Sequence, residues 1–206
     1  MTLRTTLLAA AATVGMSATS FAIPITAGSQ FNIDGFVRAI PAGATIDQAT
    51  GLDFTAGGGA TPGVAGVLSS TNGTGAFAGA AFQCSSNCGS IQDIPSFTGF
   101  TSTPNFYTTT VGVSFDLSSI TAISRLAATS GSLATLIVSG TGALNATGFD
   151  ATPGIFTLTT QGSSITTFSA STVSQSVAMP VPEPLSLMLL GTGLVAVGLT
   201  RRRRQA

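Results

Sequence analysis

Apolar and polar side chains alternate between residues 108 and 117, and this pattern restricts the fold more than any other feature of the chain. The side chains on one face of this segment belong to Thr109, Val111, Val113, Phe115 and Leu117. A period of two over a segment of this length predicts a β-strand with one buried and one solvated face. A weaker alternation runs from Phe31 to Arg38, and apolar or β-branched runs of strand length cover 133–139 and 155–160.

Turn signals separate the expected strands. They are Gly57-Gly58-Gly59, Pro62-Gly63, Asn72-Gly73 and Pro153-Gly154. Glycine, proline and asparagine favour turns, and the many serines and threonines suit exposed strand faces. Only 118–128 spaces its apolar residues in a near-helical way, after a serine that can cap a helix. We therefore expect residues 23–178 to form one all-β domain, an antiparallel sandwich or jelly roll.

Charged residues are few and segregated along the chain. They make up 7% of the residues, against about 25% in a typical soluble domain. Residues 23–180 hold six acids and two arginines, a net charge of −4, whereas five of the seven arginines lie in the two ends. So little positive charge argues against a nucleic-acid partner. Basic ends are typical of membrane targeting, because arginines stay on the cytoplasmic side of the bilayer.

The N-terminal residues 1–22 predict a signal peptide. Arg4 precedes the apolar stretch 7–16, and Ser20-Phe21-Ala22 has the small-x-small form of a signal-peptidase site. Cleavage after Ala22 would leave Ile23 as the first mature residue. The alternative is a buried N-terminal helix, but the combination of features favours export by way of signal peptidase.

The C-terminal residues 179–206 contain three consecutive features. Val181, Pro182, Glu183 and Pro184 come first, then Leu185–Thr200 without a charge, then Arg201, Arg202, Arg203 and Arg204. As a helix, the apolar stretch would be about 24 Å long, marginally enough to cross a hydrocarbon core of roughly 30 Å. The arginines would stop it at the cytoplasmic side, and the prolines keep the preceding backbone extended.

This order of motif, short helix and arginine cluster resembles the PEP-CTERM sorting signal. Proteins with that signal are exported by Gram-negative bacteria that make extracellular polysaccharide. The resemblance implies that an exosortase, a transpeptidase-like membrane enzyme, recognises Pro182, Glu183 and Pro184 and removes the tail. It also implies a transient membrane anchor and a final location at the cell surface or outside the cell. It covers only the tail and says nothing of the activity of residues 23–178; a permanent anchor is the rival interpretation.

Cys84 and Cys88 are the only cysteines. In an exported chain we expect them to form a disulfide that closes a small loop, because exported proteins pass through an oxidising compartment. A ring of this size contributes about 2 kcal/mol in the chain-entropy model. A metal site would need two more ligands, and the chain has no histidine and no third cysteine.

No residue set in the sequence indicates catalysis. The absence of histidine removes the commonest general base and excludes a Ser-His-Asp triad. The acids do not stand in the motifs of aspartic proteases, and Asp34, Asp53 and Asp150 are interpreted as turn residues rather than calcium ligands. We therefore expect no enzyme activity, no cofactor and no metal.

The expected function is that of a structural protein of the extracellular matrix or biofilm, associated with exopolysaccharide or with copies of itself. The alternative is a lectin-like, carbohydrate-binding module of the same matrix. Tyr107, the single tyrosine, is then the candidate sugar contact, because sugars stack on aromatic rings. Asn72-Gly73-Thr74 and Asn145-Ala146-Thr147 match the N-glycosylation pattern but equally suit turns.

Overall fold

β-strands make up most of the structure, a computed structural model that describes residues 22–56, 64–162 and 165–176. The strands are β1 (Ile23–Pro24), β2 (Gln30–Ile40), β3 (Gly51–Thr55), β4 (Gly66–Thr74), β5 (Gly89–Ile91), β6 (Thr103–Thr109), β7 (Val113–Leu126), β8 (Thr135–Ala146), β9 (Phe149–Asp150), β10 (Thr152–Gln161) and β11 (Ile165–Ser174). Three short 3-10 helices, η1 (Ile46–Gln48), η2 (Gly75–Phe77) and η3 (Ala80–Phe82), lie between strands. The expected all-β class is confirmed for the described residues.

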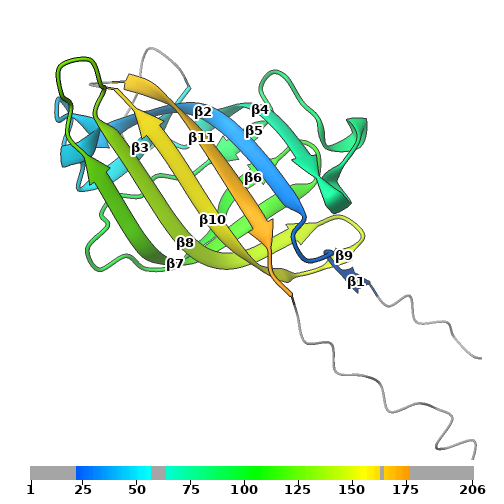
Figure 1. Ribbon diagram of the computed structural model, residues 1–206. Coiled ribbons are helices and arrows are strands. Elements are labelled where there is room, and N and C mark those ends of the chain that lie inside the picture. Colours follow the sequence, from blue (N-terminus) through cyan, green and yellow to red (C-terminus); the bar gives the residue numbers. More distant parts are fainter. Residues whose placement is uncertain (1–21, 57–63, 163–164, 177–206) are drawn as a thin grey trace, which may run out of the picture.

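Eight of the strands close into an antiparallel barrel (Figure 1). Their order around the barrel is β2, β4, β5, β6, β7, β8, β10 and β11, and β11 pairs back with β2. The closing register runs from the pair Gln30 and Val173 to the pair Arg38 and Ile165. β3 pairs with the second half of β2, and β1 pairs in parallel with β9.

The expected sandwich or jelly roll is corrected by this closure. A sandwich has two separate sheets, whereas here one sheet closes on itself through the β2–β11 pairing. Closure gives β2 and β11 hydrogen-bond partners on the sides that would otherwise be sheet edges. The local patterns of a sandwich and a barrel are the same, because both need strands with one buried and one wet face.

The alternation in β2 is confirmed. Phe31, Ile33 and Val37 are buried in the barrel, while Asn32 and Asp34, between them, are partly exposed on its outer face. A strand in a filled barrel presents every second side chain to the interior. The same rule assigns the side chains of β10 and β11 to the two faces, so it also defines the outer surface described below.

Aromatic rings fill the interior of the barrel. A chain of ring contacts with centroid separations of 5.1 to 6.3 Å joins Phe77, Phe31, Tyr107, Phe115, Phe156, Phe106, Phe54 and Phe168. All eight rings are buried. An eight-stranded barrel is just wide enough for side chains to fill it, so these rings form the hydrophobic core.

Two glycines make room for one of these rings. Gly142 in β8 is paired with Gly154 in β10. A Cβ atom would lie 2.7 Å from the ring of Phe115 if built at Gly142, and 3.3 Å from it if built at Gly154. The ring therefore lies against bare backbone, which lets the wall of the barrel come close to its core.

The single strand expected over 108–117 is in fact a hairpin. β6 ends at Thr109 and β7 begins at Val113, so a three-residue turn interrupts the alternation. Gly112 has φ +77° at this turn, a conformation that glycine adopts without strain. The turn adds an odd number of residues, so the period of two continues from one strand to the next and conceals the boundary.

The helix expected over 118–128 is also corrected, because β7 runs through most of this segment. The register of β7 against β8 shifts between Leu117 and Ser119, and again between Ile120 and Ala122. Each shift is a β-bulge, which inserts one extra residue into the strand. Inward positions therefore fall at Leu117, Ile120 and Ile123, three residues apart, and this spacing imitates one face of a helix.

Two of the expected turns lie inside strands. Asn72-Gly73 belongs to β4 and Pro153-Gly154 belongs to β10. Gly73 lies close to other backbone, since a Cβ atom there would be 2.7 Å from the carbonyl oxygen of Gln30. In these places glycine permits close packing rather than a turn. The expected turns at 57–59 and 62–63 lie outside the described residues.

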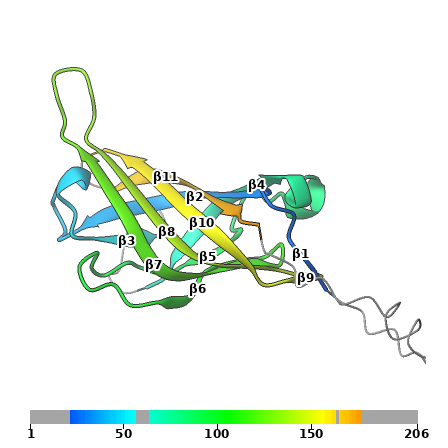
Figure 2. The same ribbon diagram turned by 60° about the horizontal axis from the view of Figure 1, so that its bottom comes forward.

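The first described strand, β1, and the end of the last, β11, lie at the same end of the barrel, here called the terminal end (Figure 1). Gly28 N donates to Ser174 O and Ser174 N donates to Ser29 O, each at 2.9 Å. The opposite end, here called the far end, contains the end of β2 and the hairpin between β7 and β8. Figure 2 shows this hairpin extending beyond the barrel wall.

Candidate functional site

Tyr107 is not available to an external sugar, which corrects the sequence-based assignment. Its side chain is fully buried, and its ring lies between those of Phe31 and Phe115. The hydroxyl donates a hydrogen bond of 2.9 Å to Thr172 Oγ1. Burial raises the pKa of Tyr107 above its ordinary value of 10.0, although the hydrogen bond to Thr172 acts in the opposite direction. Tyr107 is thus a neutral core residue at physiological pH.

The disulfide between Cys84 and Cys88 is confirmed. It closes a small loop beside the barrel wall, where Thr71 N donates to Cys84 O and Cys88 N donates to Leu68 O. Both contacts are with β4, so the loop is attached to the barrel by backbone hydrogen bonds as well as by its covalent ring.

The expected processing sites lie at the edge of the described structure or outside it. Ala22 is exposed and precedes β1 at the terminal end. The sorting motif Val181, Pro182, Glu183 and Pro184 and the arginines 201–204 lie outside the described residues. Within those residues, no helix is long and apolar enough to cross a membrane.

Both asparagines of the glycosylation patterns take part in side-chain hydrogen bonds. Asn32 Nδ2 donates to Asn72 Oδ1 at 2.8 Å, from β2 to β4. Asn145 Nδ2 donates to Asp116 Oδ2 at 3.0 Å, from β8 to β7. Both asparagines are in strands rather than in turns, and their amides contribute to contacts between strands.

The outer face of four neighbouring strands carries rows of polar side chains. The registers place one row at Ser70, Asp34, Ser169 and Thr159, and a second at Asn72, Asn32, Ser171 and Thr157. Neighbouring strands are about 4.8 Å apart, so hydroxyl and amide groups repeat at this interval around the barrel. Seven of these eight side chains are uncharged. We call this surface, on β4, β2, β11 and β10, the polar face.

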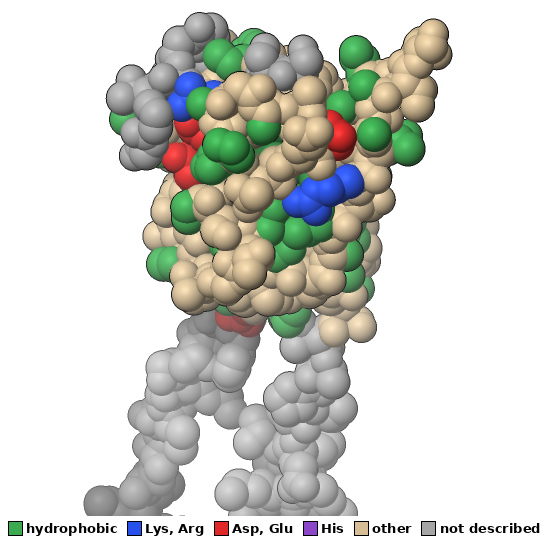
Figure 3. Space-filling model, turned by 90° about the vertical axis from the view of Figure 1, so that its left-hand side faces the viewer, with side chains coloured by type: hydrophobic (Ala, Val, Ile, Leu, Met, Phe, Trp, Pro, Cys, Tyr) green, Lys and Arg blue, Asp and Glu red, His purple; other side chains and the backbone are tan. Residues whose placement is uncertain are grey.

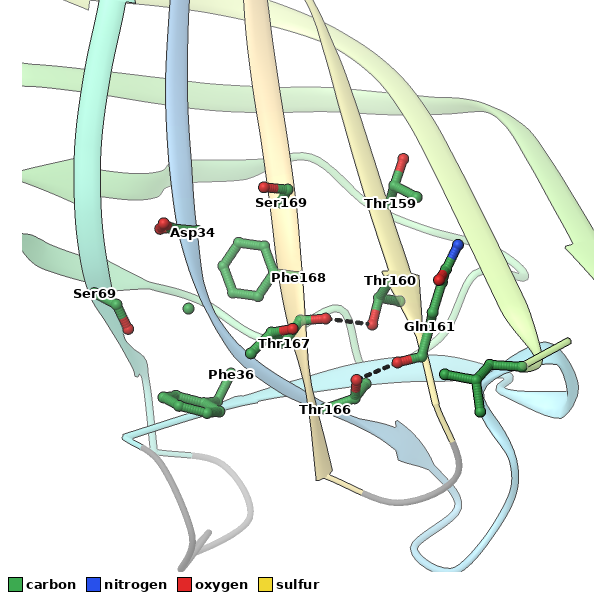
Figure 4. Close-up of a pocket in the computed structure, with 12 residues that line it drawn as sticks. Asp34, Phe36, Ser69, Thr159, Thr160, Gln161, Thr166, Thr167, Phe168 and Ser169 are labelled. Carbon is green, nitrogen blue, oxygen red and sulfur yellow. Dashed lines mark hydrogen bonds between the residues drawn. The ribbon is translucent and has the colours of Figure 1, made fainter. Parts of the chain in front are cut away.

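A groove of about 730 Å³ lies on the polar face toward the far end (Figure 4). It is lined by Asp34, Gly35, Phe36, Ser69, Leu133, Thr159, Thr160, Gln161, Thr166, Thr167, Phe168 and Ser169. Thr160 Oγ1 donates to Thr167 O at 2.9 Å and Thr166 Oγ1 donates to Gln161 O, so β10 and β11 are linked along its floor. The volume is within the range of about 300–1,000 Å³ typical of ligand sites.

Asp34 supplies the one charge of the groove lining. Ser70 Oγ lies 2.7 Å from Asp34 Oδ1 and 2.6 Å from Asp34 Oδ2, so the hydroxyl donates to this carboxylate from the adjacent strand. Phe36 lies two residues further along β2, on the same face, and its side chain is 37% exposed. The groove therefore combines a carboxylate, an exposed aromatic ring and several hydroxyl groups.

The sequence contained a signal for this site. In the weak alternation from Phe31 to Arg38, Phe36 already falls in the register of Asn32 and Asp34, the polar one. An aromatic residue in the polar register predicts an exposed ring. The sequence does not predict that β11 lies next to β2, because the pairing of Asp34 with Ser169 joins positions 135 residues apart.

Arg38 and Asp53 form an ion pair on the side of the barrel where β3 joins β2. Arg38 Nε donates to Asp53 Oδ2 at 2.7 Å, and Nη2 of the same arginine also donates to this oxygen. Asp53 is buried, and its Oδ1 has no partner among the described residues. Asp93 Oδ1 accepts a hydrogen bond from Phe54 N, 2.8 Å away. These contacts fix strands to one another, and we assign them a structural role.

Within the described residues, no group of three or more Asp, Glu, Cys or His side chains is placed to hold a metal ion. Comparison with known proteins identified no matching family, no similar curated protein and no similar solved structure. The functional argument therefore depends on the polar face and its groove.

Proposed function

We propose that this chain is an exported, non-catalytic protein of the extracellular matrix that binds exopolysaccharide through the polar face of its barrel. The routing part of the proposal depends on residues 1–22 as a signal peptide and on 179–206 as a PEP-CTERM-like sorting signal with a membrane helix. The binding part depends on the described surface, and the two parts are tested separately.

The observation that carries the binding part is the chemistry of the polar face. Its two rows present hydroxyl and amide groups at the spacing of neighbouring strands, with Asp34 as the one charged member. Groups of this kind both donate and accept hydrogen bonds, as do the hydroxyls of a polysaccharide. Viewed from the far end, much of the barrel surface is uncharged and charged side chains are few (Figure 3).

The position of the ends supports the routing part. Ala22 and Ser174 lie at the terminal end, whereas the groove lies toward the far end. A tail that held the chain at the membrane would therefore be attached at the end of the barrel away from the groove. Removal of the tail by an exosortase-like enzyme would then release the barrel with its polar face unchanged.

The binding part is tested by co-sedimentation of the protein with exopolysaccharide isolated from the native host. Ser169→Arg places a long charged side chain in the middle of the polar face and is expected to reduce the bound fraction. Ser102→Arg, at an exposed position just before β6 on the wall opposite β11, is the matched control and should bind like the wild type. Equal binding by both variants would reject the polar face as the contact surface.

The same samples also test two other functions, cleavage of the polysaccharide and self-assembly of the chain. Chain-length analysis of the polysaccharide after incubation is expected to show no cleavage, and cleavage that copurifies with the protein would contradict a non-catalytic role. Sedimentation velocity without polysaccharide is expected to give one species at all concentrations. Concentration-dependent assembly would instead support a scaffold that is built from copies of this chain.

The routing part is tested by the intact mass of the protein recovered from the native host. A mass that lacks both residues 1–22 and the tail from about Pro182 onward is expected. A mass that still includes Leu185–Ala206 would contradict processing and support a permanent anchor. An excess in steps of one hexose would reveal glycosylation in the same spectrum.

A further inference from the structure

We propose that Asp34 and Phe36 form a sugar subsite for a neutral pyranose polymer within the groove of the polar face. This inference rests on the proposed function and deepens it, because it assigns the residues that recognise the polysaccharide and the class of polysaccharide that is bound. It replaces Tyr107, which is buried, as the aromatic contact.

Phe36 supplies the stacking surface. It is the one aromatic residue of the described chain among the exposed large hydrophobic side chains, and it lines the groove together with Ser69, Thr167 and Ser169, which carry hydroxyl groups. By register its neighbour on β11 is Thr167, whose side chain is also on the outer face. A pyranose with equatorial hydroxyls has a flat C–H face, which packs on an aromatic ring while its hydroxyls reach the polar groups around it.

Asp34 supplies the hydrogen-bond acceptor. It lies about 7 Å from Phe36 along the strand, since two residues of a β-strand rise by that distance. The hydroxyl of Ser70 occupies only part of its capacity, because a carboxylate has about four lone-pair positions. A sugar stacked on Phe36 can therefore donate a hydroxyl to Asp34, and the hydroxyl of Ser169 lies on the adjacent strand.

The charge of the groove selects against acidic sugars. Its lining contains the carboxylate of Asp34 and no arginine or lysine, so nothing in the lining neutralises an incoming anion. A uronic acid would bring a second carboxylate toward Asp34, and like charges at short distance repel. The preferred ligand is therefore neutral.

Leu133 gives the groove one apolar wall. It lies at the base of the hairpin between β7 and β8, is 62% exposed, and contributes to the lining opposite Asp34 and Ser69. The groove thus extends across four neighbouring strands, from Ser69 on β4 through β2 and β11 to Gln161 on β10, with Leu133 next to the start of β8. This shape suits a chain of sugars better than a single sugar held at its end.

The test is calorimetric titration of the full chain in detergent with two hexasaccharides that differ only at C6. Cellohexaose is neutral, and the β-1,4-linked glucuronic acid hexamer carries a carboxylate on each ring. Wild-type protein is expected to bind cellohexaose saturably and to bind the acidic hexamer at least about tenfold more weakly, a difference of about 1.4 kcal/mol.

Two variants and two controls locate the binding. Phe36→Ala is expected to weaken cellohexaose binding at least tenfold, and Asp34→Asn to reduce the discrimination between the two hexamers. Ile155→Ala and Asp150→Asn are matched controls, because Ile155 is 39% exposed on the outer face of β10 and Asp150 is an exposed acid, both near the terminal end. Both controls should bind like the wild type.

The outcomes distinguish this inference from the function on which it rests. If the wild type binds native exopolysaccharide but not cellohexaose, or if Phe36→Ala binds cellohexaose like the wild type, the subsite is wrong and the proposed function remains. Stronger binding of the acidic hexamer would also overturn the subsite. Binding of neither cellohexaose nor native exopolysaccharide would overturn both proposals.

Discussion

The hydroxyl of Tyr107 donates a hydrogen bond to Thr172 Oγ1 across the interior of the barrel, at 2.9 Å. Tyr107 is on β6 and Thr172 is on β11, and four pairing steps separate these strands in either direction around the barrel. The two side chains therefore connect opposite walls. A polar contact in the middle of an aromatic core constrains the geometry, because both groups are buried and each needs its partner.

We expect Tyr107→Phe to lower the free energy of unfolding by about 1–2 kcal/mol, because it leaves the buried hydroxyl of Thr172 without this donor. Thr172→Val should have a similar effect. The double variant should be more stable than the sum of the two single effects predicts, since neither unpaired group remains. Denaturant unfolding of the four proteins measures the coupling, and strict additivity would show that the bond contributes nothing.

Stability should fall as the pH rises above 10. Burial raises the pKa of Tyr107 above its ordinary value of 10.0, so the unfolded chain loses this proton at a lower pH than the folded chain. Unfolding is thus unaffected by this group below pH 10 and is favoured above it, by up to about 1.4 kcal/mol per pH unit. Tyr107 is the only tyrosine, so tyrosinate absorbance during unfolding at pH 11 reports this group directly. The chain has no lysine, which would titrate in the same pH range. Tyrosinate absorbance in the folded protein at that pH would contradict the prediction.

Gly142→Val should destabilise the barrel by about 3 kcal/mol or more. A Cβ atom at Gly142 would lie 1.9 Å from Asp116 O and 2.7 Å from the ring of Phe115, and the backbone oxygen cannot move away by a side-chain rotation. Ala143→Val, at the next residue of β8, is the control, because its side chain is on the outer face. Thermal unfolding of both variants checks the prediction, which fails if they melt together.

Arg38→Met should lower the free energy of unfolding by about 3 kcal/mol, because it leaves the buried carboxylate of Asp53 without its cation. Adding Asp53→Leu to this variant should recover most of the loss, since apolar residues of similar size replace buried ion pairs at little cost. The comparison is made by chemical denaturation. No recovery in the double variant would mean that Asp53 has a role beyond this pair.

Local sequence patterns determined the class of the fold and several of its parts. The alternation in β2, with Phe31 and Val37 inward, follows from side chains that point to opposite faces of a strand. The pairing of Cys84 with Cys88 follows from their spacing and from the expected export. The sequence also predicts that Phe36 lies on the polar, outer face of its strand, because it is an even number of residues from Asn32 and Asp34.

The tertiary structure decided how these parts combine. Whether one sheet closes into a barrel depends on the pairing of β2 with β11, which joins residues about 130 positions apart and leaves no local signature. The bulges in β7 depend on its partner β8, so the spacing of Leu117, Ile120 and Ile123 looked helical. Tyr107 was the expected sugar contact, but closure places it inside the barrel. The groove exists only because Asp34 and Ser169 become neighbours. Residue type and parity assign a side chain to a face, but only long-range pairing decides which faces meet and which are enclosed.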